Sequence, residues 1–477
     1  MGNVLESSQM PNKTLKLIKD TALSLFAAVL LLLFSSTQVM AAGNDADATG
    51  PTGATPIAKT GVTLNATDAA GILTSDRSDD SALTIDANGA AIVFGAEASK
   101  DSLSYIAQSG SRTLTATVTD GNPGGGSLVT FAGDIDTAQD LVVLNITNTP
   151  TLFEGDVGTD VGTLDLVTIN LGAGSTTLTT TFDTGTNANN VIGANINASN
   201  ANDTITLAVT NTNGNAANTI TFGEEIGATA IDAITLAANT KVTFSKTVSV
   251  GASGTITISS TGTTTFTKVV TAGSVNLAAD GTIAVVATGG GSIFSGNIDN
   301  TTGSGNAGTL AIADQDAAIT IVGTIGATNI LKAITVDASA GNDNTFTGAV
   351  KATTFTMTGN GATDDVIFNG TANAFNLVIT ADGRATFGAD DVLTGNITTT
   401  ANGKGTLVFG TATASKSLVT GNIGSSNTLD LEAITVVTAS SFTTTLATGN
   451  VFALAVGATG AGTMALGGTW EGTAITV

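Results

Sequence analysis

The sequence contains no cysteine and no histidine. Their absence excludes disulfide bonds, thiolate nucleophiles, Cys/His zinc sites and every mechanism that needs an imidazole near neutral pH. Charged residues make up only 11% of the chain and aromatic residues 4%, whereas charged residues are about a quarter of an ordinary soluble domain. The polar surface therefore depends on uncharged side chains, and Thr, Ser and Asn supply them.

Basic residues are also scarce. The chain has 15 Lys and Arg against 38 Asp and Glu, which gives a formal net charge of −23. Nucleic acid and anionic membranes are poor partners for such a surface, whereas divalent cations suit it. Hydrophobic residues reach 42%, so the chain has enough apolar surface to fold. Together with the Thr, Ala, Gly, Val, Asn and Asp content, this composition is typical of an all-β protein.

The beginning of the chain has the order of a secretory signal peptide, which we expect over residues 1–42. A basic region with three lysines precedes an apolar run over Leu23–Phe34, and a small-residue cleavage site follows at Ala41 or Ala42. A membrane anchor is the alternative, but the run is short for a bilayer. The expected location is extracellular, at a bacterial cell surface, with no transmembrane segment in the mature chain.

Three further regions follow from local composition. Residues 43–61 are small and polar with two prolines, which predicts a flexible linker. Residues 62–130 are expected to form an N-terminal β region or cap. Residues 131–477 are expected to form a repetitive β-solenoid that ends inside a repeat.

A long repeat organises the second half of the chain. The Ile-Gly step at Gly227 opens a stretch that returns at Gly326 and again at Gly424, each time followed by Ala-Ile-Thr. The copies lie 99 (326 − 227) and 98 (424 − 326) residues apart. Such self-similarity indicates a repeat architecture.

A shorter unit is marked by a glycine that is usually followed two residues later by Ile or Val. Neighbouring members lie 22 (155 − 133), 30 (223 − 193), 27 (323 − 296) and 26 (421 − 395) residues apart. This spacing predicts a coil of about 22–30 residues. The members are Gly133, Gly155, Gly193, Gly223, Gly296, Gly323, Gly395 and Gly421.

Strand spacing can be read from one stretch. Apolar centres at Ile256, Phe266, Val275 and Ile283 are 10 (266 − 256), 9 (275 − 266) and 8 (283 − 275) residues apart, with period-two alternation around them. The three steps add up to 27 (283 − 256) residues, which predicts three short strands per coil. We therefore expect a right-handed parallel β-helix, or β-solenoid. A tandem β-sandwich array is the alternative, because its domains repeat at a similar length to the long repeat.

If the fold is a solenoid, the apolar residues of the long repeat should point inward. We expect them to include stacked positions in equivalent coils. They are Ile226, Ile231, Ile234, Ile325, Ile330, Ile334, Ile423, Leu429 and Ile434.

Three segments carry a further pattern: Phe294–Ile298, Leu393–Ile397 and Val419–Gly424 read FSGNI, LTGNI and VTGNIG. With the strands that follow them, they resemble the strand-repeat passenger regions of bacterial autotransporter surface antigens, rickettsial outer-membrane antigens in particular. The resemblance implies an exported β-helix that acts as an adhesin or a surface-layer coat, with possible outer-membrane association. A family member would end in a translocator barrel of amphipathic strands, a pattern that this sequence lacks.

Five acidic residues are candidate metal ligands. Asp343, Asp364, Asp365, Asp390 and Asp391 lie in Asp- and Gly-rich segments similar to fragments of calcium-binding nonapeptide repeats. Calcium takes several carboxylate and carbonyl oxygens, which turn residues in successive coils could supply. The tandem nine-residue period of such sites is missing, so ordinary Asx-turns are the competing interpretation.

The same sequence disfavours an enzyme. Paired carboxylates could serve acid/base catalysis, as in a polysaccharide-degrading β-helix. No aromatic or basic residue clusters beside them in the sequence, and Arg384 stands alone. We expect no catalytic residues and no cofactor other than calcium. The expected function is that of an exported cell-surface structural protein that acts through a repetitive surface and self-associates; an adhesin for cell-surface ligands is the alternative.

Overall fold

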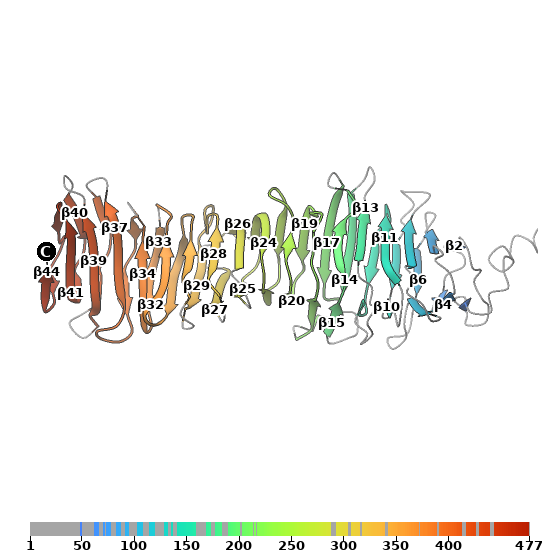
Figure 1. The fold of residues 1–477 in the computed structure, drawn as a ribbon, viewed down its shortest axis with the longest axis horizontal. Helices are drawn as coiled ribbons and strands as arrows, with labels where there is room; N and C mark the ends of the chain where they lie inside the picture. Colours follow the sequence, from blue (N-terminus) through green and yellow to red (C-terminus); the bar gives the residue numbers. More distant parts are fainter. Residues whose placement is uncertain are drawn as a thin grey trace, which may run out of the picture.

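The computed structural model describes short strands between residues 48 and 136 and most of residues 141–476 (Figure 1). In the latter range the description omits residues 159–167, 173–176, 184–188, 201–202, 213, 216, 288–291, 304–306, 315–316, 339–341, 372, 389–390, 413–415, 426–428 and 439–442. The expected signal peptide lies outside the described residues, as does the expected linker except for β1 (Ala48–Thr49).

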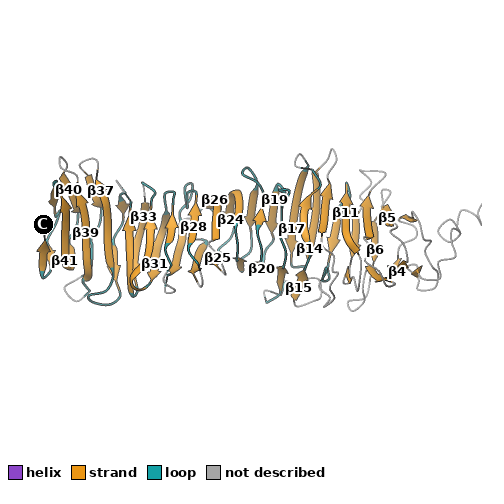
Figure 2. Cartoon of the chain, viewed as in Figure 1, coloured by secondary structure: helices purple, strands orange, loops and turns teal. Residues whose placement is uncertain are grey.

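The protein is an all-β solenoid. Strands lie side by side along one long axis and every described element is a strand or a loop (Figure 2). Apart from β1, which pairs antiparallel with β4 (Leu73–Arg77), all pairings between the named strands are parallel. Among the described residues no helix is long and apolar enough to cross a membrane. The predicted β-solenoid is confirmed, and parallel ladders of this length exclude the sandwich array.

Each coil passes over three faces, which we name by the order in which the chain meets them. The first face contains β2 (Val62–Asn65), β5 (Leu83–Asp86), β8 (Leu114–Thr119), β11 (Leu141–Thr147), β13 (Thr168–Gly172), β16 (Asn195–Ala198), β21 (Val248–Ser249), β28 (Ile319–Val322), β30 (Asn344–Phe346), β32 (Asn360–Phe368), β34 (Asp382–Phe387), β37 (Thr406–Ala412), β39 (Leu431–Thr438) and β44 (Ala474–Thr476). The second face contains β3 (Ala70–Gly71), β6 (Ala91–Phe94), β9 (Leu128–Phe131), β12 (Thr151–Phe153), β14 (Thr177–Asp183), β17 (Thr204–Thr210), β19 (Ala233–Leu236), β22 (Thr255–Ile258), β35 (Leu393–Thr394), β38 (Lys416–Val419), β40 (Thr443–Ala447) and β42 (Thr463–Ala465).

The third face contains β4, β7 (Leu103–Ala107), β10 (Ile135–Asp136), β15 (Asn189–Ile192), β18 (Thr219–Phe222), β20 (Lys241–Phe244), β23 (Thr263–Phe266), β25 (Thr282–Ala287), β27 (Thr309–Asp314), β29 (Leu331–Asp337), β31 (Lys351–Thr358), β33 (Asn373–Ile379), β36 (Ile397–Thr399) and β43 (Trp470–Glu471). Some strands bend around a corner and belong to two faces; they include β24 (Val270–Leu277), β26 (Ser292–Asn300), β33 and β41 (Val451–Gly460).

Coil length varies along the axis. Ile226 pairs with Val248 one coil later, a step of 22 (248 − 226) residues, and with Ile196 one coil earlier, a step of 30 (226 − 196). Phe368 pairs with Phe387 after only 19 (387 − 368) residues. The longest coils exceed the predicted range, because Ala91 pairs with Leu128 after 37 (128 − 91) residues and Val157 pairs with Ile192 after 35 (192 − 157). The shortest coils fall below it, so the prediction of 22–30 residues holds only for the coils of intermediate length.

The prediction of one 27-residue coil between Ile256 and Ile283 is wrong. Ile256 pairs with Val275, so the coil there has 19 (275 − 256) residues. The first face of this coil is occupied by Val270, which pairs with Val248 and directly precedes the bend of β24. Because the chain crosses this face in only a few residues, the face has no separate apolar centre in the sequence. The three steps from Ile256 to Ile283 therefore span one coil and one additional face.

The long repeat does not correspond to a whole number of coils. From Ile226, four successive pairings lead along the first face through Val248, Val270, Phe294 and Ile321, and the next face holds Ile325. From Ile334, which follows Ile325 on the third face, four pairings lead through Phe355, Leu377, Ile397 and Ile423. Each copy is therefore displaced from the last by four coils and one face.

This displacement explains how a repeat of 98–99 residues fits a coil of variable length. Every face is the same kind of unit, a short strand that ends at a corner. A sequence repeat that spans a whole number of faces places each of its strands in an existing ladder. It does not also have to span a whole number of coils. Equivalent residues of the copies therefore do not stack on one another, because Ile226, Ile325 and Ile423 occupy the first, second and third face.

The core is one continuous column of side chains. Of the predicted inward residues, Ile226, Ile231, Ile234, Ile325, Ile334, Ile423 and Ile434 are at most 1% exposed. Ile330 is 37% exposed and Leu429 is only half-buried, so these two predictions are wrong. The neighbours Leu331 and Leu431, both 0% exposed, fill the inward positions instead.

The predicted boundary at residue 131 carries no break in strand pairing. On the first face β8 pairs with β11, and on the second face β9 pairs with β12. The described strands of residues 62–130 therefore continue the ladders of the solenoid.

Candidate functional site

The predicted metal ligands lie along successive coils in the C-terminal half. Asp343 directly precedes β30, and Asp364 and Asp365 lie within β32 of the next coil. Asp391 precedes β35. The side chain of Asp364 and all of Asp390 lie outside the described structure.

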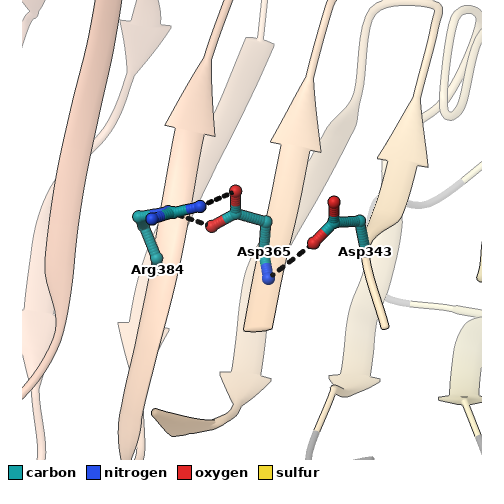
Figure 3. A network of polar contacts seen from close by, with 3 residues as sticks. All are labelled: Asp343, Asp365 and Arg384. Carbon is teal, nitrogen blue, oxygen red and sulfur yellow. Dashed lines mark hydrogen bonds and ion pairs between the residues drawn. The ribbon is translucent and has the colours of Figure 1, made fainter. Parts of the chain in front are cut away.

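Asp365 is the centre of a polar network that crosses three coils of the first face (Figure 3). The Nε and Nη2 groups of Arg384 both donate to the Asp365 carboxylate, one to each oxygen. The backbone N–H of Asp365 donates to Oδ1 of Asp343 at 3.3 Å. Because Asp365 and Arg384 are direct partners in the β32–β34 ladder, the network follows from the register of the strands.

The network neutralises a covered charge. The Asp365 side chain is only 8% exposed and the Arg384 side chain 35% exposed, so the guanidinium shields the carboxylate from water. The hydrogen bonds to Asp365 raise the pKa of Arg384 above its ordinary value, so the guanidinium stays charged at any physiological pH. The sequence interpretation of Arg384 as an isolated residue is therefore wrong. Its 19-residue distance (384 − 365) from Asp365 equals the shortest coil, which is the signal that could have revealed the pair.

Asp391 closes a local turn. Its side chain is 1% exposed, and the N–H of Gly388 donates to Asp391 Oδ2 at 3.0 Å. A carboxylate that accepts from a backbone group three residues away is what ordinary turn chemistry provides.

The described part of the chain contains no group of three or more Asp and Glu side chains that could hold a metal ion. Asp343 and Asp365 come together, but Asp365 already accepts from the Arg384 guanidinium. A calcium ion there would have to compete with that fixed cation. The predicted calcium ligands Asp364 and Asp390 stay predictions.

A second acidic pair lies on the second face. Burial raises the pKa of Glu154, and the neighbouring charge of Asp183 adds to the shift. The Asp183 carboxylate accepts hydrogen bonds from both the N–H and the hydroxyl of Thr212, so each of its oxygens is bonded to the adjacent coil. The pair therefore places the half-buried carboxyl group of Glu154 beside a carboxylate that is hydrogen-bonded to the adjacent coil.

A column of asparagines was missed at the sequence level. Oδ1 of Asn376, Asn396, Asn422 and Asn450 each accepts from the backbone N–H of the equivalent residue one coil later, at 3.1, 2.9, 2.8 and 3.1 Å. These contacts tie exposed corners of successive coils together. The recurring Gly-Asn-Ile triplet is the sequence signal for this column, and its physical role is to satisfy corner N–H groups.

Comparison of the chain with protein-family models, with curated proteins and with solved structures gives no significant match. The class that the molecule itself defines is the parallel β-solenoid. Its described polar networks link one coil to the next. The resemblance to autotransporter passenger regions remains a prediction from the sequence.

Proposed function

We propose that this chain is an exported structural protein of a bacterial cell surface, a rod that acts through its long repetitive exterior. The observation that carries the proposal is the unbroken stack of coils. Parallel pairing and a continuous buried core extend from β11 to β41, and each coil contacts only its neighbours. Such a molecule provides length and stiffness rather than a single cavity.

The charge distribution supports the same proposal. Subtracting the expected leader, with its three lysines, Glu6 and Asp20, leaves 12 (15 − 3) basic and 36 (38 − 2) acidic residues, a net charge of −24 (12 − 36). The absence of cysteine suits an exterior that does not depend on disulfides. The candidate signal peptide supplies the route out of the cell.

The proposal is tested on cells that make the chain. We expect the mature protein to begin near residue 42, to be cleaved by protease added to intact cells, and to form an ordered layer in electron micrographs of the surface. Mass spectrometry of the N-terminus and imaging provide the measurements. An intact Leu23–Phe34 segment in a cytoplasmic protein would refute export, and sparse copies bound to a cell-surface ligand would favour the adhesin.

Calcium is the expected partner of assembly. Neighbouring rods with a net charge of −24 repel one another, and divalent ions can bridge carboxylates, whereas sodium only screens them over about 8 Å at physiological ionic strength. A chelator should disperse lateral assemblies of the purified chain and leave its circular dichroism unchanged. Sodium added at equal ionic strength is the control, because it screens the carboxylates without bridging them. Unfolding by the chelator would indicate structural calcium, and assemblies that ignore calcium would refute bridging.

A further inference from the structure

The third face carries two outward columns of threonine. They run side by side from β18 to β31, at alternate positions of each strand, and every member is partly exposed. One column contains Thr219, Lys241, Thr263, Thr282, Thr309, Ala333 and Thr354, and the other contains Thr221, Thr243, Thr265, Ala284, Ala311, Thr335 and Thr356.

The columns form a regular lattice. None of the pairings that link β18, β20, β23, β25, β27, β29 and β31 shifts its register. Parallel strands place successive members about 4.8 Å apart along a column and the two columns about 6.6 Å apart. The inward residues between them, such as Ile220, Val242 and Ile283, are at most 1% exposed and hold the strands from below. Threonine is stiff at χ1, so its methyl and hydroxyl groups repeat with the backbone.

The hydroxyls of these columns are available to an external partner. In the described structure, Thr221, Thr243 and Thr265 make no side-chain hydrogen bond to another protein group. Threonines just beyond the strands behave differently. Thr267 donates to the carbonyl of Phe244 at 3.2 Å, and Thr301 donates to that of Leu277 at 3.3 Å. These corner hydroxyls are therefore hydrogen-bonded within the chain, whereas the hydroxyls of Thr221, Thr243 and Thr265 on the third face can form hydrogen bonds with a partner.

The chemistry of the face restricts the partner. Lys241 is the one ionisable residue in the two columns. Between β18 and β31 the aromatic rings of this face, such as Phe222, Phe244 and Phe266, are at most 1% exposed, so none of them can stack on a sugar. The partner must be flat, uncharged and periodic, and must present hydrogen-bonding groups at fixed spacings.

We propose that the third face binds the surface of ice. Water molecules at an ice surface hold repeating positions whose spacings are close to those of the two columns. Hydroxyls can enter that lattice by hydrogen bonding, and the methyl groups order the water in the gaps between them. Each contact is weak, but a rigid array engages many at once, so binding grows steeply with the number of aligned coils.

The second face fits this role less well. Its outward positions also include threonine, but Thr257 is followed along the column by Asn276 and Asp299. A carboxylate and an amide in the array change both its charge and its shape. On the third face, both columns contain only Thr and Ala from β23 to β31, beyond Lys241.

The test uses the purified chain. In a nanolitre osmometer we expect its freezing point to lie below its melting point, with faceted ice crystals in the gap. Thr265→Lys should narrow that gap, because it extends the interruption at Lys241 by one coil into the stretch from β23 to β31, where neither column has an ionisable residue. Thr386→Lys is the matched control, because Thr386 is an outward, half-buried strand residue of the first face between Ile367 and Val408.

Circular dichroism of all three proteins must be the same for the comparison to count, and Thr335→Lys provides a second third-face variant. Full hysteresis in both third-face variants, equal loss in Thr386→Lys, or no ice shaping by the folded chain would overturn the proposal. Binding to crystalline polysaccharide in place of ice, or dimerisation that Thr265→Lys abolishes, would assign the face to that other partner and overturn it as well.

Discussion

Replacement of Ile334 by Asp is expected to open the middle of the solenoid. Ile334 is 0% exposed and lies between its ladder partners Leu310 and Phe355, which are also 0% exposed. A carboxylate there has no partner and no water, which costs about 3–5 kcal/mol of folding free energy. Because the stability of a solenoid is a sum of neighbouring terms, the loss should appear as local opening around β29.

Limited proteolysis followed by mass spectrometry measures this opening. Cleavage of Ile334→Asp should begin near residues 330–340, well before the rest of the chain is digested. Thr335→Asp is the control, because the Thr335 side chain is exposed and points to the other side of the same strand. Equal protease resistance of Ile334→Asp and the parent chain would mean that the register of the third face is wrong.

Much of the fold is predictable from the sequence because its signals are local. Alternating Thr and Ile marks the strands, recurring glycines mark the corners, and the absence of proline after Pro150 permits unbroken ladders. The arrangement of the long repeat could not be predicted in the same way. A face crossed in two or three residues, as at Val270, leaves no separate signal, so counting apolar centres miscounts the faces.

The polar network shows a second limit of sequence analysis. Asp365 and Arg384 are 19 residues apart (384 − 365), and only the length of that one coil brings them together. Coil lengths vary from 19 (387 − 368) to 37 (128 − 91) residues, so the partner of any outward residue is undetermined until the length of its coil is known. The inward residues are easier to predict than the outward ones, because a large apolar residue at either of two neighbouring positions can fill the core. At one such place the sequence predicts that Ile330 points inward, and its neighbour Leu331 does so instead.

The corner glycines separate into two kinds that the sequence does not distinguish. A Cβ atom added at Gly348 would lie 2.1 Å from the carbonyl oxygen of Gly323 one coil earlier, which is a backbone overlap that no side-chain movement relieves. A Cβ atom added at Gly223 would lie 3.6 Å from the carbonyl oxygen of Ile192, an ordinary contact. Both glycines end a strand and precede a core Val or Ile, yet only Gly348 is required by close packing of coils.

Gly348→Ala is therefore expected to destabilise the protein by about 1–3 kcal/mol, the range typical of overpacking, because two adjacent coils must separate at that corner. Gly223→Ala should change stability by a few tenths of a kcal/mol at most and provides the control, since it makes the same substitution at a corner where the added Cβ atom has room. Chemical denaturation monitored by circular dichroism, together with protease sensitivity around residues 345–352, measures both variants. Equal stability of the two variants would show that successive coils are not in close backbone contact at Gly323 and Gly348, and the spacing of the coils at that corner would have to be revised.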